Sequence, residues 1–307
     1  MEKIVIAFGG NALQRPGEKP VYSSQRANVA RAVDSISPVF RGKRGVLITH
    51  GNGMQVGEEF LRNEYAEREV ETLSWPALVA ETQATIGTML ETAILGKLRR
   101  MRIRRGVSAL LTHVLISPND RAFGKPEKPV GPLYSKRGLG VALKHERFAY
   151  VKVSGGYRRV VASPEPVGIA EIETISHLIS GGRVIIAGGG GGIPIVNSSG
   201  SYPASPAVID KDLTAQLIAT LVGADTLVIL TGEEYVYLDY PKRAKPIKTS
   251  RATELKRMLG SFEGGTMRPK VDACIRFIEK GGRRAFIGGL GSFESIMEGR
   301  SGTRIIR

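Results

Sequence analysis

Three apolar runs that each end in glycines restrict most strongly how this chain can fold. The runs are KIVIAF, GVLIT and RVIIA, at residues 3–8, 45–49 and 183–187. Short, β-branched runs bounded by glycine are typical of strands buried on both faces of a parallel sheet. In such sheets, ligands bind at the carboxyl ends of the strands. The segments that follow the runs are Gly9, Gly10 and Asn11; Gly51, Asn52 and Gly53; and residues 188–192, which are all glycine.

The rest of the chain alternates between predicted strands and helices. Four further strands are expected at 109–116, 226–230, 285–287 and 303–306. Helices are expected at 22–38, 55–69, 77–100, 168–180, 211–222, 251–259, 270–280 and 292–298. Alternation of this kind predicts an α/β fold with a mostly parallel central sheet.

Residues 117–166 break this alternation. They begin with SPNDRAFGKPEKPVGPLYSKRG, which is rich in proline, glycine and charge, and they include the short strand-like runs FAYVKV and GYRRVV. A segment of this length between strands predicts an inserted subdomain or lid rather than a plain loop. We expect one division near residue 175, with an N-terminal half at 1–174 that contains the insertion and a C-terminal half at 175–307.

The composition is that of an ordinary globular protein. The 307 residues suffice for one large or two moderate domains, and 42% are hydrophobic and 6% aromatic. Cys274 is the single cysteine, which excludes an internal disulfide and a cysteine-based metal site and favours a reducing compartment. The first residues lead directly into a strand pattern without signal-peptide features, and no stretch is apolar for long enough to span a bilayer. We therefore expect a soluble cytoplasmic protein.

The chain is basic, with 44 Lys and Arg against 29 Asp and Glu and a formal net charge of +15. Such a charge attracts anions and would allow nucleic-acid binding. The basic residues are spread along the chain, however, with small clusters such as KLRRMRIRR at 97–105, and neither interleaved aromatic residues nor a nucleic-acid motif accompanies them. We expect most of them to be solvated and some to attract a polyanionic small substrate, so nucleic acid is not an expected partner.

The glycine segments are suited to holding a phosphate. Glycine lets the backbone approach an anion and present N–H groups to it, and the helices expected after the first two segments add a positive dipole end. A single pair of glycines at a strand end is more often only a tight turn, but three such ends favour a phosphate site. The chain contains neither G-x-x-x-x-G-K-[ST] nor G-x-G-x-x-G, so a nucleotide would be held in another way.

An Asp-Lys-Asp triplet, residues 210–212, opens the helix predicted at 211–222. Asp210 is the expected N-cap of this helix. Clustered carboxylates can orient an ammonium group or hold a metal, so the triplet is harder to explain as ordinary surface than a lone lysine is.

Two more lysines lie near these features. Lys270 follows Pro269, which is expected at the first position of a helix, and Lys128 lies in the insertion. Each lysine alone would be typical of an exposed surface. In phosphoryl transfer, however, the protein mainly supplies positioning and positive charge around the moving group. Lysines beside glycine loops suit that chemistry.

Seven sequence blocks resemble, in chain order, the motifs of the carbamate kinases, a branch of the amino acid kinase family. The blocks are IVIAFGGNAL, THGNGMQVG, NDRAFGKPEKPVGPLY, GYRRVVASPEPV, AGGGGGIPIV, VIDKDLTAQLIA and GTMRPKV. GGN and the glycine-rich turn occur across the wider family, whereas HGNGxQVG, KPxGPxY and IDKDLTA indicate the carbamate branch. The likeness extends over nearly the whole chain.

This resemblance implies a three-layer αβα sandwich that forms a homodimer, with the insertion at 117–166 as a protruding lid. It implies the reversible reaction of carbamoyl phosphate with ADP to give ATP and carbamate, with Mg²⁺ accompanying the nucleotide and no metal held by the protein alone. Two alternatives stay open. The first is another kinase of the family, acting on N-acetylglutamate, a uridine nucleotide or another small acid or phosphate. The second is a non-catalytic binder of nucleic acid.

The resemblance also assigns roles to residues. Lys128, Lys211 and Lys270 would surround the transferred phosphoryl group, and Asp210 would organise these lysines. The residues implied to line the substrate site are Gly9, Gly10, Asn11, Gly51, Asn52 and Gly53. Those implied to bind ATP or ADP are Gly188, Gly189, Gly190, Asp212, Tyr237 and Met267, together with the segment EEYVYLDYPK at 233–242.

Three positions depart from the family pattern. Met54 replaces a proline, Arg268 a glycine and Gly232 an aspartate, which leaves nucleotide preference and rate open. A carbamate oxygen is already anionic, so its attack on phosphorus requires no general base. We therefore expect His50, the histidine nearest the predicted site, to have a structural or hydrogen-bonding role.

Overall fold

A computed structural model describes residues 1–307 except 16–17, 19–20, 137–148, 154, 239–244 and 263–265. Part of the predicted lid, at 137–148 and 154, and residues 239–242 of the predicted nucleotide segment therefore lie outside the described residues. Among the described helices, none combines the length and apolar character needed to cross a membrane.

The centre of the molecule is one large sheet. Its strands are β1 (Lys3–Phe8), β2 (Gly45–His50), β3 (Val107–Ala109), β9 (Val184–Ile186), β11 (Thr226–Thr231), β14 (Thr249–Arg251), β15 (Arg284–Gly289) and β16 (Thr303–Ile306). They lie in the order β14-β16-β15-β11-β1-β2-β9-β3, and all neighbours are parallel except β15 and β16. The mostly parallel sheet predicted from the strand and helix alternation is confirmed.

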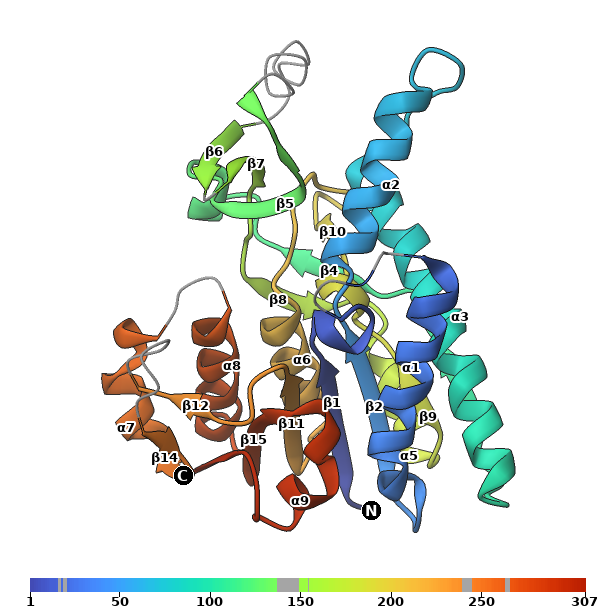
Figure 1. The fold of residues 1–307 in the computed structure, drawn as a ribbon, viewed down its shortest axis with the longest axis vertical. Helices are drawn as coiled ribbons and strands as arrows, with labels where there is room; N and C mark the ends of the chain where they lie inside the picture. The colour runs from blue at the N-terminus through green and yellow to red at the C-terminus, as the bar shows by residue number, and fades with distance from the viewer. Residues whose placement is uncertain (16–17, 19–20, 137–148, 154, 239–244, 263–265) are drawn as a thin grey trace.

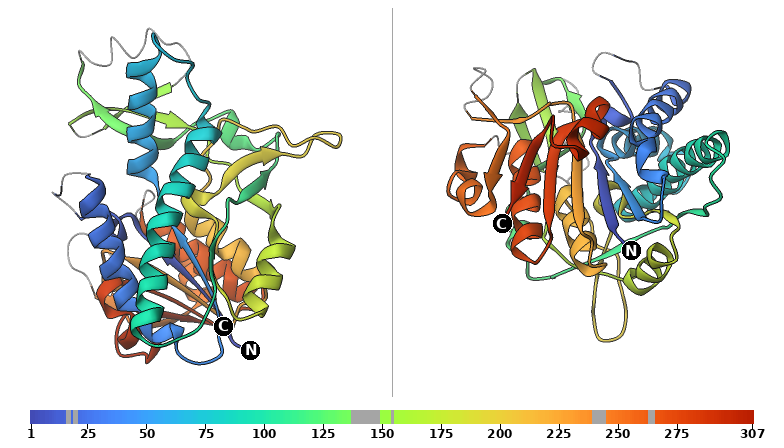
Figure 2. Two further views of the ribbon diagram at one scale, coloured as in Figure 1. Left: turned by 90° about the vertical axis from the view of Figure 1, so that its right-hand side faces the viewer. Right: turned by 90° about the horizontal axis from the view of Figure 1, so that it is seen from below.

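Helices cover both faces of this sheet (Figures 1 and 2). They are α1 (Tyr22–Ile36), α2 (Gly53–Ala66), α3 (Trp75–Arg100), α5 (Ile172–Ser180), α6 (Lys211–Leu221), α7 (Ala252–Arg257), α8 (Met267–Glu279) and α9 (Phe293–Met297). Alternate residues of β1 face opposite sides: Ile4 and Ile6 pack in the core with α1, α3 and α9, and Val5 and Ala7 pack in the core with α5 to α8. The result is the expected three-layer αβα sandwich.

The insertion forms a small sheet of its own above the central sheet (Figure 1). This sheet, called the lid here, consists of β5 (Lys128–Tyr134), β6 (Ala149–Val153) and β7 (Gly156–Val161), which are antiparallel in the order β5-β7-β6. A second sheet, of β4 (His113–Ile116), β8 (Pro166–Ile169) and β10 (Ile193–Val196), lies between the lid and the body.

Two predicted elements differ from the structure. The strand predicted at 109–116 is two strands, β3 and β4, in different sheets, because the side chain of Gln83 and the backbone of Ile186 hold the segment between them. The helix predicted at 168–180 begins only at Ile172, since the preceding residues form β8 and pair with β4.

Candidate active site

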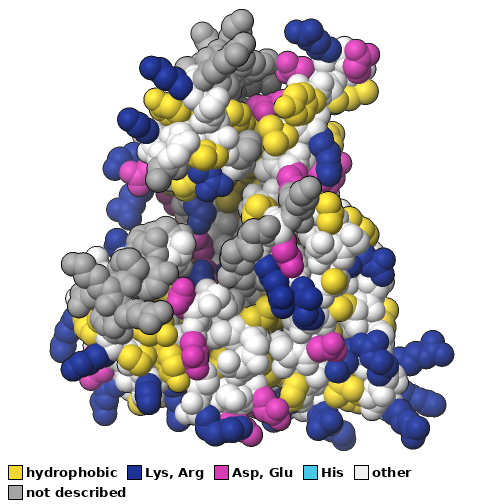
Figure 3. Space-filling view, viewed as in Figure 1, with side chains coloured by type: hydrophobic (Ala, Val, Ile, Leu, Met, Phe, Trp, Pro, Cys, Tyr) yellow, Lys and Arg dark blue, Asp and Glu magenta, His cyan; other side chains and the backbone are white. Residues whose placement is uncertain are grey.

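A cavity of about 240 Å³ lies at the carboxyl ends of β1 and β2, below the lid. Figure 3 shows the corresponding hollow between the lid and the body of the molecule. Glycine loops, the beginnings of three helices and Lys128 of the lid contribute its walls. The lining residues are Gly10, Gly51, Asn52, Gly53, Lys128, Gly190, Val208, Ile209, Asp210, Lys211, Asp212, Thr266, Pro269 and Lys270.

The loops after β1 and β2 lie side by side in this cavity. The N–H of Gly51 donates a hydrogen bond to the carbonyl of Phe8, at 3.2 Å. A Cβ atom at Gly51 would lie 3.4 Å from Cδ of Lys211 and 3.8 Å from N of Gly10, so the lysine stem passes close to both loops. Asn11 lies in the short helical turn Gly10–Ala12 that follows β1.

Helix α2 presents its N-terminus to the cavity at Gly53. Asn52 is the N-cap residue, but its side chain does not cap the helix. Instead, Nδ2 of Asn52 donates to Oγ1 of Thr82 in α3, at 2.8 Å. The first N–H groups of α2 are therefore left for a ligand, and the helix dipole makes an anion the favoured one.

The glycine run 188–192 packs behind the loop that follows β2 and reaches the cavity only at Gly190. All five glycines are buried, and four of them have positive φ. A Cβ at Gly189 would lie 2.3 Å from Nε2 of His50, and one at Gly190 would lie 2.2 Å from Nδ2 of Asn52. Only Gly190 of this run lines the cavity, so close packing behind the substrate loop is what requires glycine here.

Two carboxylates hold the three lysines. Nζ of Lys211 lies 2.5 Å from Oδ1 of Asp212, and Nζ of Lys270 lies 3.0 Å from Oδ2 of the same residue. Nζ of Lys128 lies 2.7 Å from Oδ2 of Asp210, whose Oδ1 accepts from the N–H of Asp212 and so caps α6. Asp210, which was expected to organise the three lysines, therefore pairs with Lys128, and Asp212, which was expected to contact the nucleotide, pairs with the other two.

The charges of this cluster favour a bound anion. Burial by itself would raise the pKa of Asp212, but the ammonium groups of Lys211 and Lys270 outweigh it and lower this pKa to about 2. Burial lowers the pKa of Lys211, against the opposing effect of Asp212. With Lys128 and Asp210 included, three positive and two negative side chains leave the cluster one positive charge in excess. The α2 N-terminus adds to that potential.

Several predicted residues lie outside the cavity. Gly9, Tyr237 and Met267 do not line it: Gly9 donates to the carbonyl of Leu230, Tyr237 ends β12 (Val236–Tyr237), and Met267 begins α8. Because α8 begins at Met267, Pro269 is the third residue of that helix rather than the first. The three unusual positions, Met54, Gly232 and Arg268, are all exposed.

Two polar residues of α3 support the site without a strong signal in the sequence. One is Thr82, which accepts the hydrogen bond from Asn52. The other is Gln83, which is 4% exposed and whose Nε2 donates to the carbonyls of Gly189 and Thr112, at 3.0 and 3.2 Å. In the sequence, these two residues appear only as a Thr-Gln pair on the apolar face of a predicted helix. The residues to which they form hydrogen bonds lie far away in the chain.

His50 is buried behind the loop after β2. Its Nδ1 lies 3.0 Å from the carbonyl oxygen of Gly51. Burial lowers the pKa of His50 to about 4, and the nearby Lys211 ammonium acts in the same direction. The imidazole is therefore neutral at neutral pH, which fits the structural role expected for it.

The buried imidazole predicts a loss of stability in mild acid. Because the folded-state pKa of about 4 lies below the ordinary value, the unfolded chain takes up a proton first as the pH falls from 6.5 to 4. The free energy of unfolding should decrease by about 3 kcal/mol over this range. Urea unfolding at several pH values should show this slope in the wild type, a flatter slope in His50→Gln, and an unchanged slope in His177→Gln, whose histidine is exposed. Equal slopes in all three would contradict the assignment.

Arg159 of β7 fastens the lid to α2. It is 1% exposed, its Nη2 lies 2.6 Å from Oε1 of Glu64, and its guanidinium lies 3.8 Å from the ring centre of Phe60. Because α2 begins at Gly53 in the cavity and β5 carries Lys128, this contact helps to set the position of Lys128 above the glycine loops.

We expect Arg159→Met to lower the free energy of unfolding by about 2 kcal/mol, because it removes a buried guanidinium and leaves Glu64, whose side chain is 26% exposed, without this partner. The lid should also become more sensitive to limited proteolysis. Arg62→Met is the matched control, since Arg62 lies on α2 with its side chain 68% exposed and pairs with Glu59. If both variants unfold at the same urea concentration, Arg159 does not fasten the lid.

Comparison with known proteins agrees with this geometry. The sequence pattern of the amino acid kinase family matches residues 2–289. Carbamate kinase from Thermococcus kodakarensis is 38% identical over 314 residues, and the alignment covers 100% of both chains. Carbamate kinase from Thermoplasma acidophilum is 38% identical over 310 residues, again with 100% of both chains covered.

Solved structures resemble the fold over the same extent. Carbamate kinase from Giardia lamblia bound to AMP-PNP superimposes with a TM-score of 0.93 and 32% sequence identity. The match covers 99% of this chain and 98% of the other. Lid, body and site region are therefore all included in the likeness.

Proposed function

Since the chain belongs to the amino acid kinase family, and within it to the carbamate kinase branch, we propose that it transfers a phosphoryl group reversibly between ATP and carbamate. The products in one direction are ADP and carbamoyl phosphate. One observation carries this proposal: three ammonium groups and the N-termini of α2, α6 and α8 meet at one cavity of about 240 Å³.

The proposed chemistry requires charge and alignment rather than a proton acceptor. A carbamate oxygen attacks the γ-phosphorus of ATP, and the bond from that phosphorus to the β–γ bridging oxygen breaks. The electron pair of this bond remains on ADP, and no proton moves. Lys211 and Lys270 would offset the negative charge that spreads over the phosphoryl oxygens. This role fits the site, because no histidine is among the residues that line the cavity.

The two sides of the cavity suggest how the substrates are arranged. The loops of the N-terminal half, with Gly10, Gly51 and Gly53, would hold carbamate or the carbamoyl group. The nucleotide would lie against the C-terminal half, where α6 and α8 begin. Lys128 would approach from the lid, held by Asp210. This arrangement is supported by the position of the lysines between the two sets of loops.

Mg²⁺ would arrive with the nucleotide. Within the described residues, no group of three or more His, Cys, Asp or Glu side chains is arranged to hold a metal. Asp210 and Asp212 face the cavity but are paired with lysines. This donor set fits a Mg²⁺ ion bound mainly by phosphate oxygens and water, and the ion would supply additional positive charge at the phosphates.

The resemblance to carbamate kinases further supports a homodimer. Light scattering coupled to size-exclusion chromatography should give twice the chain mass of 33.1 kDa. A mass of one chain at micromolar concentration would contradict this part of the proposal.

The activity is tested by mixing the purified protein with ADP, Mg²⁺ and carbamoyl phosphate. We expect ATP to form, and carbamoyl phosphate to form when ATP and carbamate are supplied. A panel with ATP and N-acetylglutamate or a uridine nucleotide as acceptor should show no transfer. Transfer to either of these acceptors, with no ATP formed from carbamoyl phosphate, would overturn the proposal in favour of another activity of the family.

A further inference from the structure

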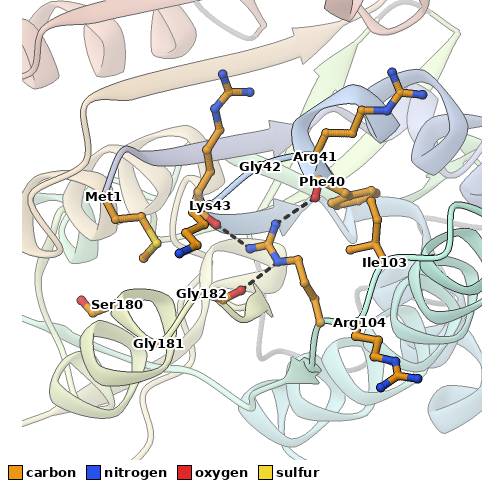
Figure 4. Close-up of a pocket in the computed structure, with 12 residues that line it drawn as sticks. Met1, Phe40, Arg41, Gly42, Lys43, Ile103, Arg104, Ser180, Gly181 and Gly182 are labelled. Atoms are coloured by element: carbon orange, nitrogen blue, oxygen red, sulfur yellow. Dashed lines mark hydrogen bonds between the residues drawn. The ribbon is translucent and has the colours of Figure 1, made fainter.

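The lid contributes Lys128 to the wall of the cavity of about 240 Å³ at the ends of β1 and β2, called the active cavity here. A second cavity, of about 590 Å³, lies at the opposite edge of the central sheet (Figure 4) and is lined by segments of the body: Met1 and residues 40–44, 103–105 and 180–182. Arg105 joins these segments by donating to the carbonyls of Arg44 and Gly182, at 2.5 and 2.8 Å. The shape of the second cavity is therefore set within the body, whereas that of the active cavity also depends on how the lid is seated.

Two glycines touch where the lid meets α2. Gly57 is the fifth residue of α2 and is buried, and Gly131 lies in β5, three residues after Lys128. A Cβ atom at Gly57 would lie 2.8 Å from Cα and 3.4 Å from N of Gly131. The backbone of the lid strand is therefore in direct contact with the helix, with no side chain between them.

The two positions require glycine for different reasons. Gly131 has φ of +70°, and a Cβ there would meet nothing within 4 Å among the described residues, so its conformation is what favours glycine. It lies where the register between β5 and β7 shifts after Val130, and its carbonyl accepts from Nη2 of Arg158 at 2.7 Å. Gly57, in contrast, lies inside an α-helix, where glycine is less favourable than alanine. The close approach of the Gly131 backbone explains why glycine occupies position 57.

Apolar packing keeps this contact closed. Val56 of α2 is 2% exposed and Val130 of β5 is 6% exposed, and both belong to a buried cluster that includes Trp75, Leu78 and Val79 of α3. Each valine is the direct neighbour of one of the two glycines in the chain. The separation of β5 from α2 is therefore set by how closely Gly57 and Gly131 can approach each other.

Helix α2 is the more firmly held of the two elements. At its beginning, Nδ2 of Asn52 donates to Oγ1 of Thr82 in α3, at 2.8 Å. Near its end, the side chain of Asn63 accepts from the N–H of Leu73 and donates to the carbonyl of the same residue, at 3.1 and 2.9 Å. If a side chain were added at Gly57, β5 would therefore be the element that moves.

Such a movement would displace Lys128. Restoring an ordinary carbon–carbon contact at Gly57 would require a shift of about 0.7 Å or more. Lys128 lies on the same strand as Gly131, and its Nζ lies 2.7 Å from Oδ2 of Asp210, which belongs to the body. Gly53, one helical turn before Gly57, lines the active cavity together with Lys128. A shift of β5 would change the position of the ammonium group relative to both.

We propose that Gly57 is a positioning residue for phosphoryl transfer: its lack of a side chain seats β5 on α2 and so places the ammonium group of Lys128 at the transferred group. The inference rests on the proposed kinase function and adds to it a residue that does not line the active cavity. Misplacement of a charge by a fraction of an ångström weakens stabilisation of the transition state, while the glycine loops of the body still bind the substrates.

The test compares Gly57→Ala with Gly96→Ala, in the wild-type chain and in the chain carrying Lys128→Ala. Gly96 is also inside a helix, but a Cβ there would lie 3.6 Å from Nη1 of Arg100, at the end of a flexible side chain. In the wild-type chain, Gly57→Ala should lower kcat for ATP formation by about tenfold or more and change KM by less than about threefold. Gly96→Ala should change neither value.

The chain with Lys128→Ala shows whether Gly57 acts through this lysine. There, Gly57→Ala should lower kcat by less than about twofold further, because the group that it positions is already absent. A further tenfold loss would mean that Gly57 acts on the fold as a whole. Wild-type kcat for Gly57→Ala alone would also overturn the proposal. Val130→Ala, which loosens the same contact from the side of the lid, is the second variant should Gly57→Ala fail to fold, and the same outcomes decide.

General destabilisation is controlled by Arg105→Met, which removes hydrogen bonds within the body. Its kcat should equal that of the wild type at a temperature at which both are folded. An equal loss of kcat in Arg105→Met and Gly57→Ala would show that lowered stability, rather than the seating of the lid, is the cause.

A measurement without turnover separates this inference from the proposed kinase activity. Acetylation of Lys128 by acetic anhydride, followed by mass spectrometry, reports whether its amine is still held against Asp210. The rate should rise by about twofold or more in Gly57→Ala, the size expected for the loss of a partly exposed ion pair, and should stay unchanged in Gly96→Ala. An unchanged rate in Gly57→Ala would contradict the inference even if the wild type forms ATP. An increased rate would support the seating of Lys128 even if it does not.

Discussion

Replacement of Lys211 by alanine is expected to lower turnover with ADP and carbamoyl phosphate by about two orders of magnitude or more, as the loss of one preorganised charge donor does in other enzymes. Lys270→Ala should have a similar effect. Both ammonium groups lie on Asp212 and line the cavity, so each would contact the phosphoryl group in flight. The measurement is kcat under saturating substrates, together with far-ultraviolet circular dichroism to verify the fold.

Lys256→Ala is the control for this experiment. Lys256 pairs with Glu279, and its side chain is 60% exposed, whereas those of Lys211 and Lys270 are largely buried. Its loss should leave kcat unchanged. Wild-type turnover in both Lys211→Ala and Lys270→Ala would mean that these lysines are ordinary structural residues.

Asp212→Asn is expected to damage both stability and activity. The Asp212 side chain is 3% exposed and pairs with two ammonium groups, so its neutralisation leaves buried positive charge without a partner. Breaking a buried ion pair in this way costs about 3–5 kcal/mol. Urea unfolding at pH 7 should show this loss, and kcat should fall because Lys211 and Lys270 lose the group that holds them together.

The pH dependence gives Asp212→Asn an independent check. The folded-state pKa of about 2 lies below the ordinary value for aspartate, so the stabilisation is complete above about pH 4 and is lost as the pH falls towards 2. The variant should lack this part of the acid dependence. Asp272→Asn, in which the replaced residue pairs with Arg276 on the surface of α8, should retain it. Identical acid curves for wild type and Asp212→Asn would contradict the assignment.

Much of the fold was predictable because buried parallel strands have a distinct composition. The runs at 3–8, 45–49 and 226–230 are apolar, β-branched and bounded by glycine or polar residues, and each is a central strand. The break between β3 and β4 was not predictable. It depends on Gln83 of α3, which forms hydrogen bonds with Thr112, 29 positions away in the chain.

The candidate site was predictable in its residue types more than in its pairings. Glycine loops and lysines at helix beginnings indicate a phosphate site whatever their order along the chain. The structure brings most of the predicted residues to one cavity. Which carboxylate faces which lysine depends on contacts across 58 and 82 positions of the chain. The sequence places Asp210 and Asp212 at the same helix start, and only the folded chain distinguishes the cap from the partner of two lysines.

The basic clusters illustrate the same limit. The runs RGKR at 41–44 and KLRRMRIRR at 97–105 are separate in the sequence, and each alone resembles an ordinary solvated surface. They meet because β2 and β3 enter the same region of the sheet on either side of β9. Charge that is dispersed along the chain becomes local only through the strand order.

The most direct measurement is a crystal structure of the protein with AMP-PNP and Mg²⁺. We propose that the glycine loops, the helix N-termini and three lysines surround one transferred phosphoryl group. We therefore expect the terminal phosphate in the cavity at the ends of β1 and β2, with Nζ of Lys211 and Lys270 about 3 Å from its oxygens. A terminal phosphate bound outside this cavity, with both lysines still paired only to Asp212, would contradict the claim.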